Sequence, residues 1–219
     1  MVPPAVKFCG LTRTEDAAEA VAAGAAFVGV IFAGGPRLLD AGRASEVLEA
    51  VPPGVLRVGV FGGQPLDEIA AISERLGLAI VQLHGDPTPL DVQRARAATG
   101  RGIWAAARVE GDTLPLGLAD LFAVADAVVL DAKVPGQLGG TGVRVPWADV
   151  AARVAAARGA GRLVLAGGLT PENVAEAVRA IVPDIVDVSS GVESSPGIKD
   201  HQRLRAFQAA VASTAESHE

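Results

Sequence analysis

The chain has 219 residues, half of them hydrophobic and only 4% aromatic, so a core must be built mainly from Ala, Val, Leu and Ile. A formal net charge of −6 leaves no basic excess to neutralise phosphates, which argues against a nucleic-acid-binding protein. No run reaches the roughly 18 apolar residues of a membrane span, and the first residues lack the apolar core of a signal peptide. With one cysteine no intrachain disulfide can form, so we expect a soluble, cytoplasmic protein that does not bind a membrane.

Short apolar runs alternate with alanine-rich amphipathic segments along the whole chain. The apolar runs predict eight strands, at residues 5–9, 26–32, 55–61, 78–84, 102–107, 127–131, 163–167 and 184–190. Helical patterns lie between them, for example at residues 14–24, 65–77, 89–100 and 171–182. Alternation without a linker predicts an α/β fold, a single-domain (β/α)8 TIM barrel over residues 1–219. An open doubly wound sheet would also alternate, but no GxGxxG fingerprint follows the first strand.

Two helix starts carry capping signals. The stretch from Thr12 to Glu15 has the spacing of a capping box and predicts a helix start there. Thr170-Pro171 predicts a cap followed by proline at the first position of the seventh helix. Cys9 therefore lies just before a helix start, at the carboxyl end of the first strand. In a (β/α)8 barrel, this end carries the chemistry.

Alternation along a strand also predicts which polar side chains face the barrel interior. Lys7 and Cys9 share one face of the first strand, and a lysine would not pack against the helices, so this face is expected to point inward. Three further pairs share a face in the same way: Gln82 with His84, Val129 with Asp131, and Asp187 with Ser189. The inward polar residues are thus expected to gather at one rim of the barrel.

Each of these residues also has a purely structural interpretation. A lone buried cysteine is more often inert than reactive, and Asp131 can simply cap the following loop. Lys7 and Asp187 lie on strands that become neighbours when the barrel closes, so they can be only a buried ion pair. His84 is expected to be a hydrogen-bonded pocket residue, and no metal site is predicted, because no second His or Cys lies at ligand spacing. Cys9 and Asp131 together, from opposite parts of the ring, suit a base and an acid on either side of one substrate.

Glycine-rich loops follow the last two predicted strands. The segments "LAGGLTPENV" (165–174) and "DVSSGVESSPG" (187–197) stand where such barrels commonly bind phosphate through backbone N–H groups. Tight turns alone are the alternative, but two such loops in these positions favour phosphate. A third glycine-rich segment (133–147) after the sixth strand resembles a mobile lid beside Asp131.

Six motif stretches span the chain in order: "KFCGLT" at 7–12, "VGVF" at 58–61, "QLHGD" at 82–86, "LDAKVPGQLGGTG" at 130–142, "LAGGLTPENV" at 165–174 and "DVSSGVESSPGIKD" at 187–200. Through these stretches the chain resembles the phosphoribosylanthranilate isomerases of tryptophan biosynthesis. Two departures are a shorter stretch "AGGPRLLD" after the second strand, and Gly62-Gly63 where the family usually has Val-Asn. The resemblance implies an Amadori rearrangement of N-(5'-phosphoribosyl)anthranilate to carboxyphenylamino-deoxyribulose phosphate, with a phosphorylated aminosugar substrate and no cofactor.

The same resemblance implies roles for individual residues. Cys9 matches the general base, Asp131 matches the general acid, and Arg37 matches an arginine that holds the anthranilate carboxylate. Gln82 and His84 are expected to contact the substrate. The phosphate is expected on backbone groups of the last two loops, at Gly167, Gly168, Ser189, Ser190 and Gly191.

The proposed chemistry sets expectations for two pKa values. Lys7 and the nearby helix start are expected to lower the pKa of the Cys9 thiol from its ordinary value of about 8.5. Burial is expected to raise the pKa of Asp131 and keep its carboxyl protonated.

Three other functions fit parts of the sequence. A histidine-pathway isomerase performs the same rearrangement, but such enzymes are longer and have aspartate in place of Cys9. Indole-glycerol-phosphate synthase would need a lysine–glutamate pair at strand ends, which the sequence lacks. A non-catalytic phosphate-binding barrel would bind a ligand without turnover. The sequence does not predict an oligomeric state.

Overall fold

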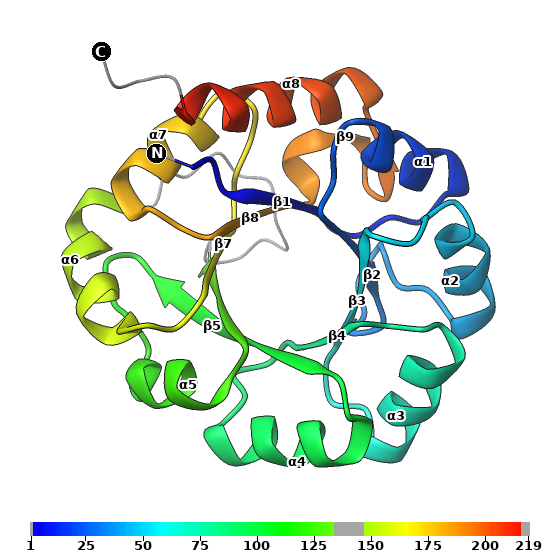
Figure 1. The fold of residues 1–219 in the computed structure, drawn as a ribbon, viewed down its shortest axis with the longest axis horizontal. Coiled ribbons are helices and arrows are strands. Elements are labelled where there is room, and N and C mark those ends of the chain that lie inside the picture. The colour runs from blue at the N-terminus through cyan, green and yellow to red at the C-terminus, as the bar shows by residue number, and fades with distance from the viewer. Residues whose placement is uncertain (1, 134–146, 216–219) are drawn as a thin grey trace.

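Eight parallel strands close into a barrel surrounded by helices in the computed structural model, which describes residues 2–133 and 147–215 (Figure 1). The barrel strands are β1 (Ala5–Phe8), β2 (Phe27–Ile31), β3 (Leu56–Phe61), β4 (Ile80–Leu83), β5 (Gly102–Glu110), β6 (Ala127–Lys133), β7 (Leu163–Ala166) and β8 (Ile185–Val188). The helices are α1 (Thr14–Ala22), α2 (Ala41–Leu48), α3 (Leu66–Arg75), α4 (Pro89–Thr99), α5 (Leu118–Val124), α6 (Trp147–Arg158), α7 (Val174–Ile181) and α8 (His201–Ala212). The strands follow one another around the ring in chain order and β1 pairs with β8, which confirms the (β/α)8 barrel.

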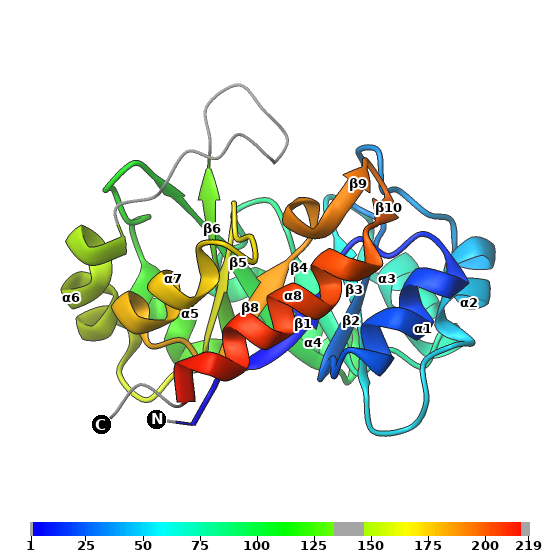
Figure 2. The ribbon, with the colours of Figure 1, turned by 90° about the horizontal axis from the view of Figure 1, so that it is seen from above.

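Short elements complete the chain after β8. They are the 3-10 helices η1 (Ser190–Val192) and η2 (Ser213–Ala215) and the antiparallel hairpin of β9 (Glu193–Ser195) and β10 (Ile198–Lys199). Figure 2 shows this hairpin at the end of the barrel toward which β6 points, with the first residues of the chain and the end of α8 at the opposite end. The hairpin therefore lies on the rim formed by the carboxyl ends of the strands.

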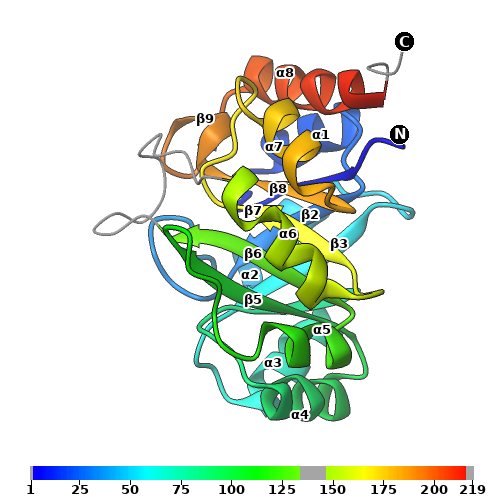
Figure 3. The ribbon, with the colours of Figure 1, turned by 90° about the vertical axis from the view of Figure 1, so that its left-hand side faces the viewer.

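All eight predicted strands are present. The largest difference from the predicted bounds is the end of β5. This strand continues to Glu110 because it pairs with β6 along its length, as far as Glu110 with Lys133. Helices α5, α6 and α7 lie in sequence around the outside of the neighbouring strands (Figures 1 and 3).

Among the described residues, no helix has both the length and the apolar character needed to cross a membrane. The predicted lid segment at 133–147 lies outside the described residues except at its two ends.

The buried apolar side chains form two clusters, one on the inner face of the strands and one on their outer face. The barrel interior holds side chains such as Phe27, Val129 and Trp104, and the Phe27 and Trp104 rings meet edge to face at 5.1 Å. The outer cluster packs against the helices and includes Phe8 and Val188. Burying a large apolar side chain contributes roughly 1.5–3 kcal/mol. Since Phe8 and Val188 face outward, the polar residues that alternate with them face the interior, as predicted.

The capping box predicted for α1 is wrong. The N-cap is Arg13, and no side chain caps the helix there. The hydroxyl of Thr12 instead donates to the carbonyl of Gly197 at 2.5 Å. Thr12 thus holds the turn of the β9–β10 hairpin, and this long-range contact takes the place of the local capping bond.

The predicted start of α7 is also wrong, because the helix begins at Val174 with Asn173 as N-cap. Thr170 precedes a turn in which its hydroxyl oxygen accepts from the N–H of Glu172 at 3.3 Å. The Asn173 side chain accepts from the N–H of Thr170 at 2.8 Å and donates to the carbonyl of Gly168 at 2.9 Å. The capping signal therefore shapes the loop between β7 and α7.

Asp16 joins the hairpin to the first helix from a fully buried position. Its carboxylate accepts from Arg13 Nη2 at 2.7 Å and from the backbone N–H of Lys199 at 3.0 Å, and His201 Nε2 lies 2.9 Å away. Burial alone would raise the pKa of Asp16, but these partners outweigh it and lower the pKa. One carboxylate thus fixes β10 and the start of α8 against α1.

Replacing Asp16 with asparagine is expected to lower the free energy of unfolding at pH 7 by about 2–3 kcal/mol, because Arg13 and the hairpin lose a charged acceptor. Since the folded pKa lies below the unfolded value of about 3.9, the wild-type contribution is complete above that value and is lost as pH falls through the folded pKa. Urea titrations at pH 7 and pH 3 measure both effects. An equal loss at the two pH values would contradict this role.

Candidate active site

Lys7 forms a polar floor inside the barrel, below its carboxyl-terminal mouth. Its side chain is fully buried, and Nζ donates to Asp187 Oδ2 at 2.6 Å and to Gln82 Oε1 at 2.9 Å. Lys7 pairs directly with Asp187 across β1 and β8. Burial alone would lower the pKa of Lys7, but Asp187 and Cys9 outweigh it and raise the pKa. The predicted buried ion pair is therefore present, and Gln82 supports it from β4.

Cys9 follows β1 directly and points into the barrel. Its N–H donates to the carbonyl of Val188 at 2.9 Å, which continues the pairing of β1 with β8. A Cβ atom added to Gly29 on β2 would lie 2.9 Å from Cys9 Sγ and 3.2 Å from Lys7 Cε. The absent side chain of Gly29 therefore leaves the space that the thiol and the lysine occupy. Sequence analysis missed Gly29, which is a single glycine within an apolar run.

The pKa of the Cys9 thiol is raised, contrary to the expectation that it would be lowered. Burial is the largest cause, and the charge of Asp187 acts in the same direction. Lys7 does stabilise the thiolate, as expected, but its effect is smaller than that of desolvation. Only 6% of the Cys9 surface is exposed, so the loss of hydration raises the pKa of the thiol more than the adjacent ammonium lowers it.

Asp131 lies on the inner face of β6, between Arg108 of β5 and Ala166 of β7 in the strand register. The surrounding protein desolvates its carboxyl and raises its pKa, as expected, while His84 and Lys7 act in the opposite direction. Lys7 and Asp187 thus influence the pKa of both Cys9 and Asp131. Cys9, which follows β1, and Asp131, on β6, therefore lie at the same end of the barrel.

Arg108 is a second cation close to Asp131 that sequence analysis missed. Its Nε donates to Asp86 Oδ1 at 2.9 Å, and Nη2 donates to Asp86 Oδ2 at 2.5 Å. This bidentate pair holds the guanidinium on the loop after β4, and Arg108 lowers the pKa of Asp131 less than His84 and Lys7 do. The end of β5 could not be assigned to the site from sequence because the predicted strand stopped before it.

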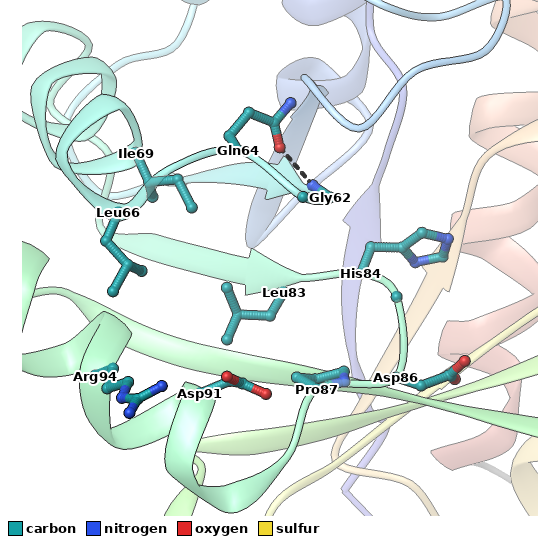
Figure 4. Close-up of a pocket in the computed structure, with 12 residues that line it drawn as sticks. Gly62, Gln64, Leu66, Ile69, Leu83, His84, Asp86, Pro87, Asp91 and Arg94 are labelled. Carbon is teal, nitrogen blue, oxygen red and sulfur yellow. Dashed lines mark hydrogen bonds between the residues drawn. The ribbon is translucent and has the colours of Figure 1, made fainter.

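His84 follows β4, and its N–H donates to the carbonyl of Phe61 at 2.7 Å. It lines a cavity of about 270 Å³ between the loops after β3 and β4, together with Leu66, Ile69 and Leu83. Figure 4 shows the imidazole extending away from Leu66 and Ile69. His84 therefore stands between this cavity and the mouth that holds Asp131. Among the described residues, no group of three or more His, Cys, Asp or Glu side chains could hold a metal ion.

Arg37 lies beside the first loop, where its Cδ would be 2.5 Å from a Cβ added to Gly10. Its Nε and Nη2 donate to the carboxylate of Glu193 at 2.7 and 2.6 Å. Lys199 Nζ donates to the same carboxylate at 2.9 Å and to the carbonyl of Ser189 at 3.0 Å. Neither Glu193 nor Lys199 could be assigned to the site from sequence, because their burial depends on the fold of the hairpin.

The two predicted phosphate loops lie in contact. Gly167 and Gly168 adopt left-handed φ angles of 84° and 66°, which glycine tolerates. A Cβ added to Gly191 would lie 1.8 Å from the carbonyl oxygen of Leu169, so only glycine allows this approach. The buried hydroxyl oxygen of Ser189 has no hydrogen-bond partner among the described residues. The loops after β7 and β8 thus form one continuous surface of backbone and hydroxyl groups.

Replacing Gly29 with alanine is expected to displace the Cys9 thiol and to lower kcat/KM roughly 10- to 100-fold, since small misplacements of a reacting group are costly. Gly102→Ala is a matched control, because the added Cβ would make only ordinary contacts of 3.5 Å or more. Steady-state kinetics of both variants, with a melting curve for each, separate the two cases. Equal kinetics would show that Gly29 does not set the thiol position.

A closed barrel with an acid, a thiol and a glycine-rich surface at its carboxyl-terminal mouth defines an enzyme of the (β/α)8 class. The profile of the family "N-(5'phosphoribosyl)anthranilate (PRA) isomerase" matches residues 6–210. The chain therefore belongs to this family of isomerases, which act in tryptophan biosynthesis.

Individual relatives agree with the family match. The chain is similar to an N-(5'-phosphoribosyl)anthranilate isomerase of Rubrobacter xylanophilus, at 43% identity over 95% of this chain and 98% of the relative. It is similar to the crystal structure of phosphoribosyl anthranilate isomerase from Thermus thermophilus, with a TM-score of 0.81 and 40% identity over 95% of this chain and 98% of that one. A second similar structure is a phosphoribosyl anthranilate isomerase in complex with reduced 1-(o-carboxyphenylamino)-1-deoxyribulose 5-phosphate, with a TM-score of 0.83 and 29% identity over 96% of this chain and 99% of that one.

Proposed function

We propose that the chain isomerises N-(5'-phosphoribosyl)anthranilate with Cys9 as general base and Asp131 as general acid. The observation that carries this assignment is that both groups face one barrel mouth and are influenced by the same buried pair, Lys7 and Asp187. The strands that carry them, β1 and β6, lie on different sides of the ring, so a substrate between them meets a base and an acid.

Asp131 acts first in this mechanism. Its protonated carboxyl donates a proton to the furanose ring oxygen, the bond from that oxygen to C1' breaks, and the anthranilate nitrogen becomes a Schiff base. A raised pKa favours this step, because it keeps the carboxyl protonated at higher pH. The ionised Asp131 that remains is favoured by His84 and by Lys7, which both lower the pKa of this carboxyl.

Cys9 acts in the second step. Its thiolate removes the proton from C2', and the electron pair moves into the Schiff base to give an enolamine. The enolamine then gains a proton at C1' as its C2' hydroxyl loses one, which gives the ketone, an isomer of the substrate. The raised thiol pKa makes the thiolate a strong base that is present in a small fraction near neutral pH.

The remaining residues hold the two anionic ends of the substrate. Arg37 retains N–H donors beyond those that bind Glu193, and these can bind the anthranilate carboxylate. The ring and sugar are proposed to contact His84 and Gln82. The phosphate is proposed to bind backbone N–H groups of both glycine-rich loops, at Gly167, Gly168, Ser189, Ser190 and Gly191. The complex of the similar isomerase with a reduced product analogue supports a phosphorylated small molecule as substrate. A biosynthetic reaction of this kind suits a cytoplasmic location.

An anthranilate-type fluorescence assay tests the activity. Freshly made phosphoribosylanthranilate is expected to lose its fluorescence faster when the protein is added, and the ketone product is expected in equal molar amount. Saturable binding of the substrate without faster decay would instead identify a binding protein. That result would refute the catalytic assignment of Cys9 and Asp131.

A further inference from the structure

Lys199 is a buried lysine beneath the proposed phosphate loop. Only 3% of its surface is exposed, and Nζ contacts two groups: the carbonyl oxygen of Ser189 at 3.0 Å and Glu193 Oε1 at 2.9 Å. Its backbone N–H donates to the buried carboxylate of Asp16 at 3.0 Å. Both ends of the residue are therefore fixed, one to α1 and one to the loop after β8.

The bond to Ser189 sets the orientation of the next N–H group. In a trans peptide, the C=O and the following N–H point in opposite directions, and the described residues contain no cis peptide bond. When Lys199 binds the carbonyl of Ser189 on one side, the N–H of Ser190 must point to the other side. Ser190 begins η1, in the position where barrels of this class use N–H groups to bind phosphate.

We propose that Lys199 is a positioning residue that aims the Ser189–Ser190 peptide at the substrate phosphate. This inference rests on the phosphate site of the proposed function. The next part of the loop is fixed by the packing of Gly191 on Leu169, but at the Ser189 carbonyl itself the Val192 N–H of the short η1 turn reaches only to 3.4 Å. Without the ammonium, that carbonyl loses its shortest partner and the peptide plane is free to rotate.

Glu193 bridges two cations and neutralises part of their charge. Its carboxylate lies between the ammonium of Lys199 and the guanidinium of Arg37. Glu193 therefore holds both the arginine proposed to bind the anthranilate carboxylate and the lysine proposed to position the phosphate loop. Burial lowers the pKa of Lys199, and Glu193 opposes that effect. Lys199 also stabilises the Cys9 thiolate slightly, so a change in kcat alone would not test the positioning role.

The test measures how strongly Lys199→Met weakens binding of a phosphate group. The probes are reduced 1-(o-carboxyphenylamino)-1-deoxyribulose 5-phosphate and the same compound without its phosphate, titrated by calorimetry. We expect the variant to bind the phosphorylated probe roughly tenfold more weakly and the dephosphorylated probe within about twofold of wild type, because one charge-assisted contact to the loop is lost. The KM for the substrate is expected to rise in parallel.

Arg57→Met is the matched control. Arg57 also donates to backbone carbonyls, those of Leu76 and Val51 at 3.1 Å, but it does so at the start of β3 on the far end of the barrel. Its loss is expected to lower stability and leave both affinities unchanged. Equal weakening of both probes by Lys199→Met, or no weakening of either, would overturn the positioning role. If wild-type protein does not prefer the phosphorylated probe, the proposed phosphate site itself is wrong, and the inference falls with it.

Discussion

Asp131→Asn is expected to lower kcat by ~10² or more while the fold is kept, because an amide of the same shape is far too weak an acid to transfer a proton to the ring oxygen. The loss should appear in kcat as well as in kcat/KM, since the proton transfer contributes in the transition state rather than in binding. Stopped-flow fluorescence with freshly prepared substrate measures it. The circular dichroism spectrum and the melting temperature of the variant show whether the barrel is intact.

A matched control exists at the other end of the same strand. Asp126 precedes β6 and accepts from the N–H of Ile103 at 2.6 Å and from Arg96 at 2.8 Å, so Asp126→Asn removes a comparable carboxylate away from the mouth. This control is expected to lower stability and to leave kcat within about twofold. Near wild-type turnover in Asp131→Asn would show that a group other than Asp131 is the general acid.

The raised pKa of Asp131 also predicts the pH dependence of wild type. The acid acts while protonated and the thiol while ionised, so the rise of kcat/KM with pH that thiolate formation causes is expected to level off above the folded pKa of this carboxyl, at a pH above the ordinary value for aspartate. Asp131→Asn has no titrating group there. Its residual kcat/KM is therefore expected to keep rising with pH where that of wild type levels off, which a pH profile of both proteins measures.

The barrel and the inner face of its strands could be predicted because both follow from short-range patterns. Apolar runs and helical segments alternate along the whole chain, and side chains alternate with a period of two within each run. The pairing of Lys7 with Asp187 followed from closing the ring, since each is the inward residue of a terminal strand. Even the ends of the strands were mostly found, except where β6 extends β5.

The rest of the site depends on contacts between distant parts of the chain. Glu193 and Lys199 look like exposed charges beside a turn, and only the folded hairpin buries them against Arg37. Thr12 has the spacing of a cap, yet its hydroxyl binds Gly197. The space that Gly29 leaves for Cys9 depends on how β1 and β2 pair in the folded barrel.

The pKa of Cys9 shows a different limit of sequence reasoning. The sign of each contribution could be predicted, since an adjacent ammonium stabilises a thiolate and burial disfavours it. Their relative sizes depend on how much water the fold removes, and the structure gives the larger effect to burial. The sequence placed the thiol correctly and could not weigh these two effects.

Cys9→Ser is the second substitution with a large expected effect, a drop in kcat of ~10² or more, because a hydroxyl in this position ionises far less readily than a thiol. Wild-type kcat/KM is expected to rise with pH as the thiolate forms, until Asp131 loses its proton. The serine variant should lose this rise, since it has no group that titrates in that range. The control is chemical: Cys9 is the single cysteine of the chain, so an alkylating reagent modifies one thiol and should reproduce the loss in wild type alone.

Protection separates the role of the thiol as a base from a role in packing. The thiol is almost fully buried, so alkylation is expected to be slow, and a bound product analogue should slow it further if the analogue covers Sγ. Alkylation that proceeds at the same rate with and without the analogue would place the thiol away from the substrate. Combined with normal turnover in Cys9→Ser, that result would remove the base from the mechanism and leave Asp131 without a partner across the mouth.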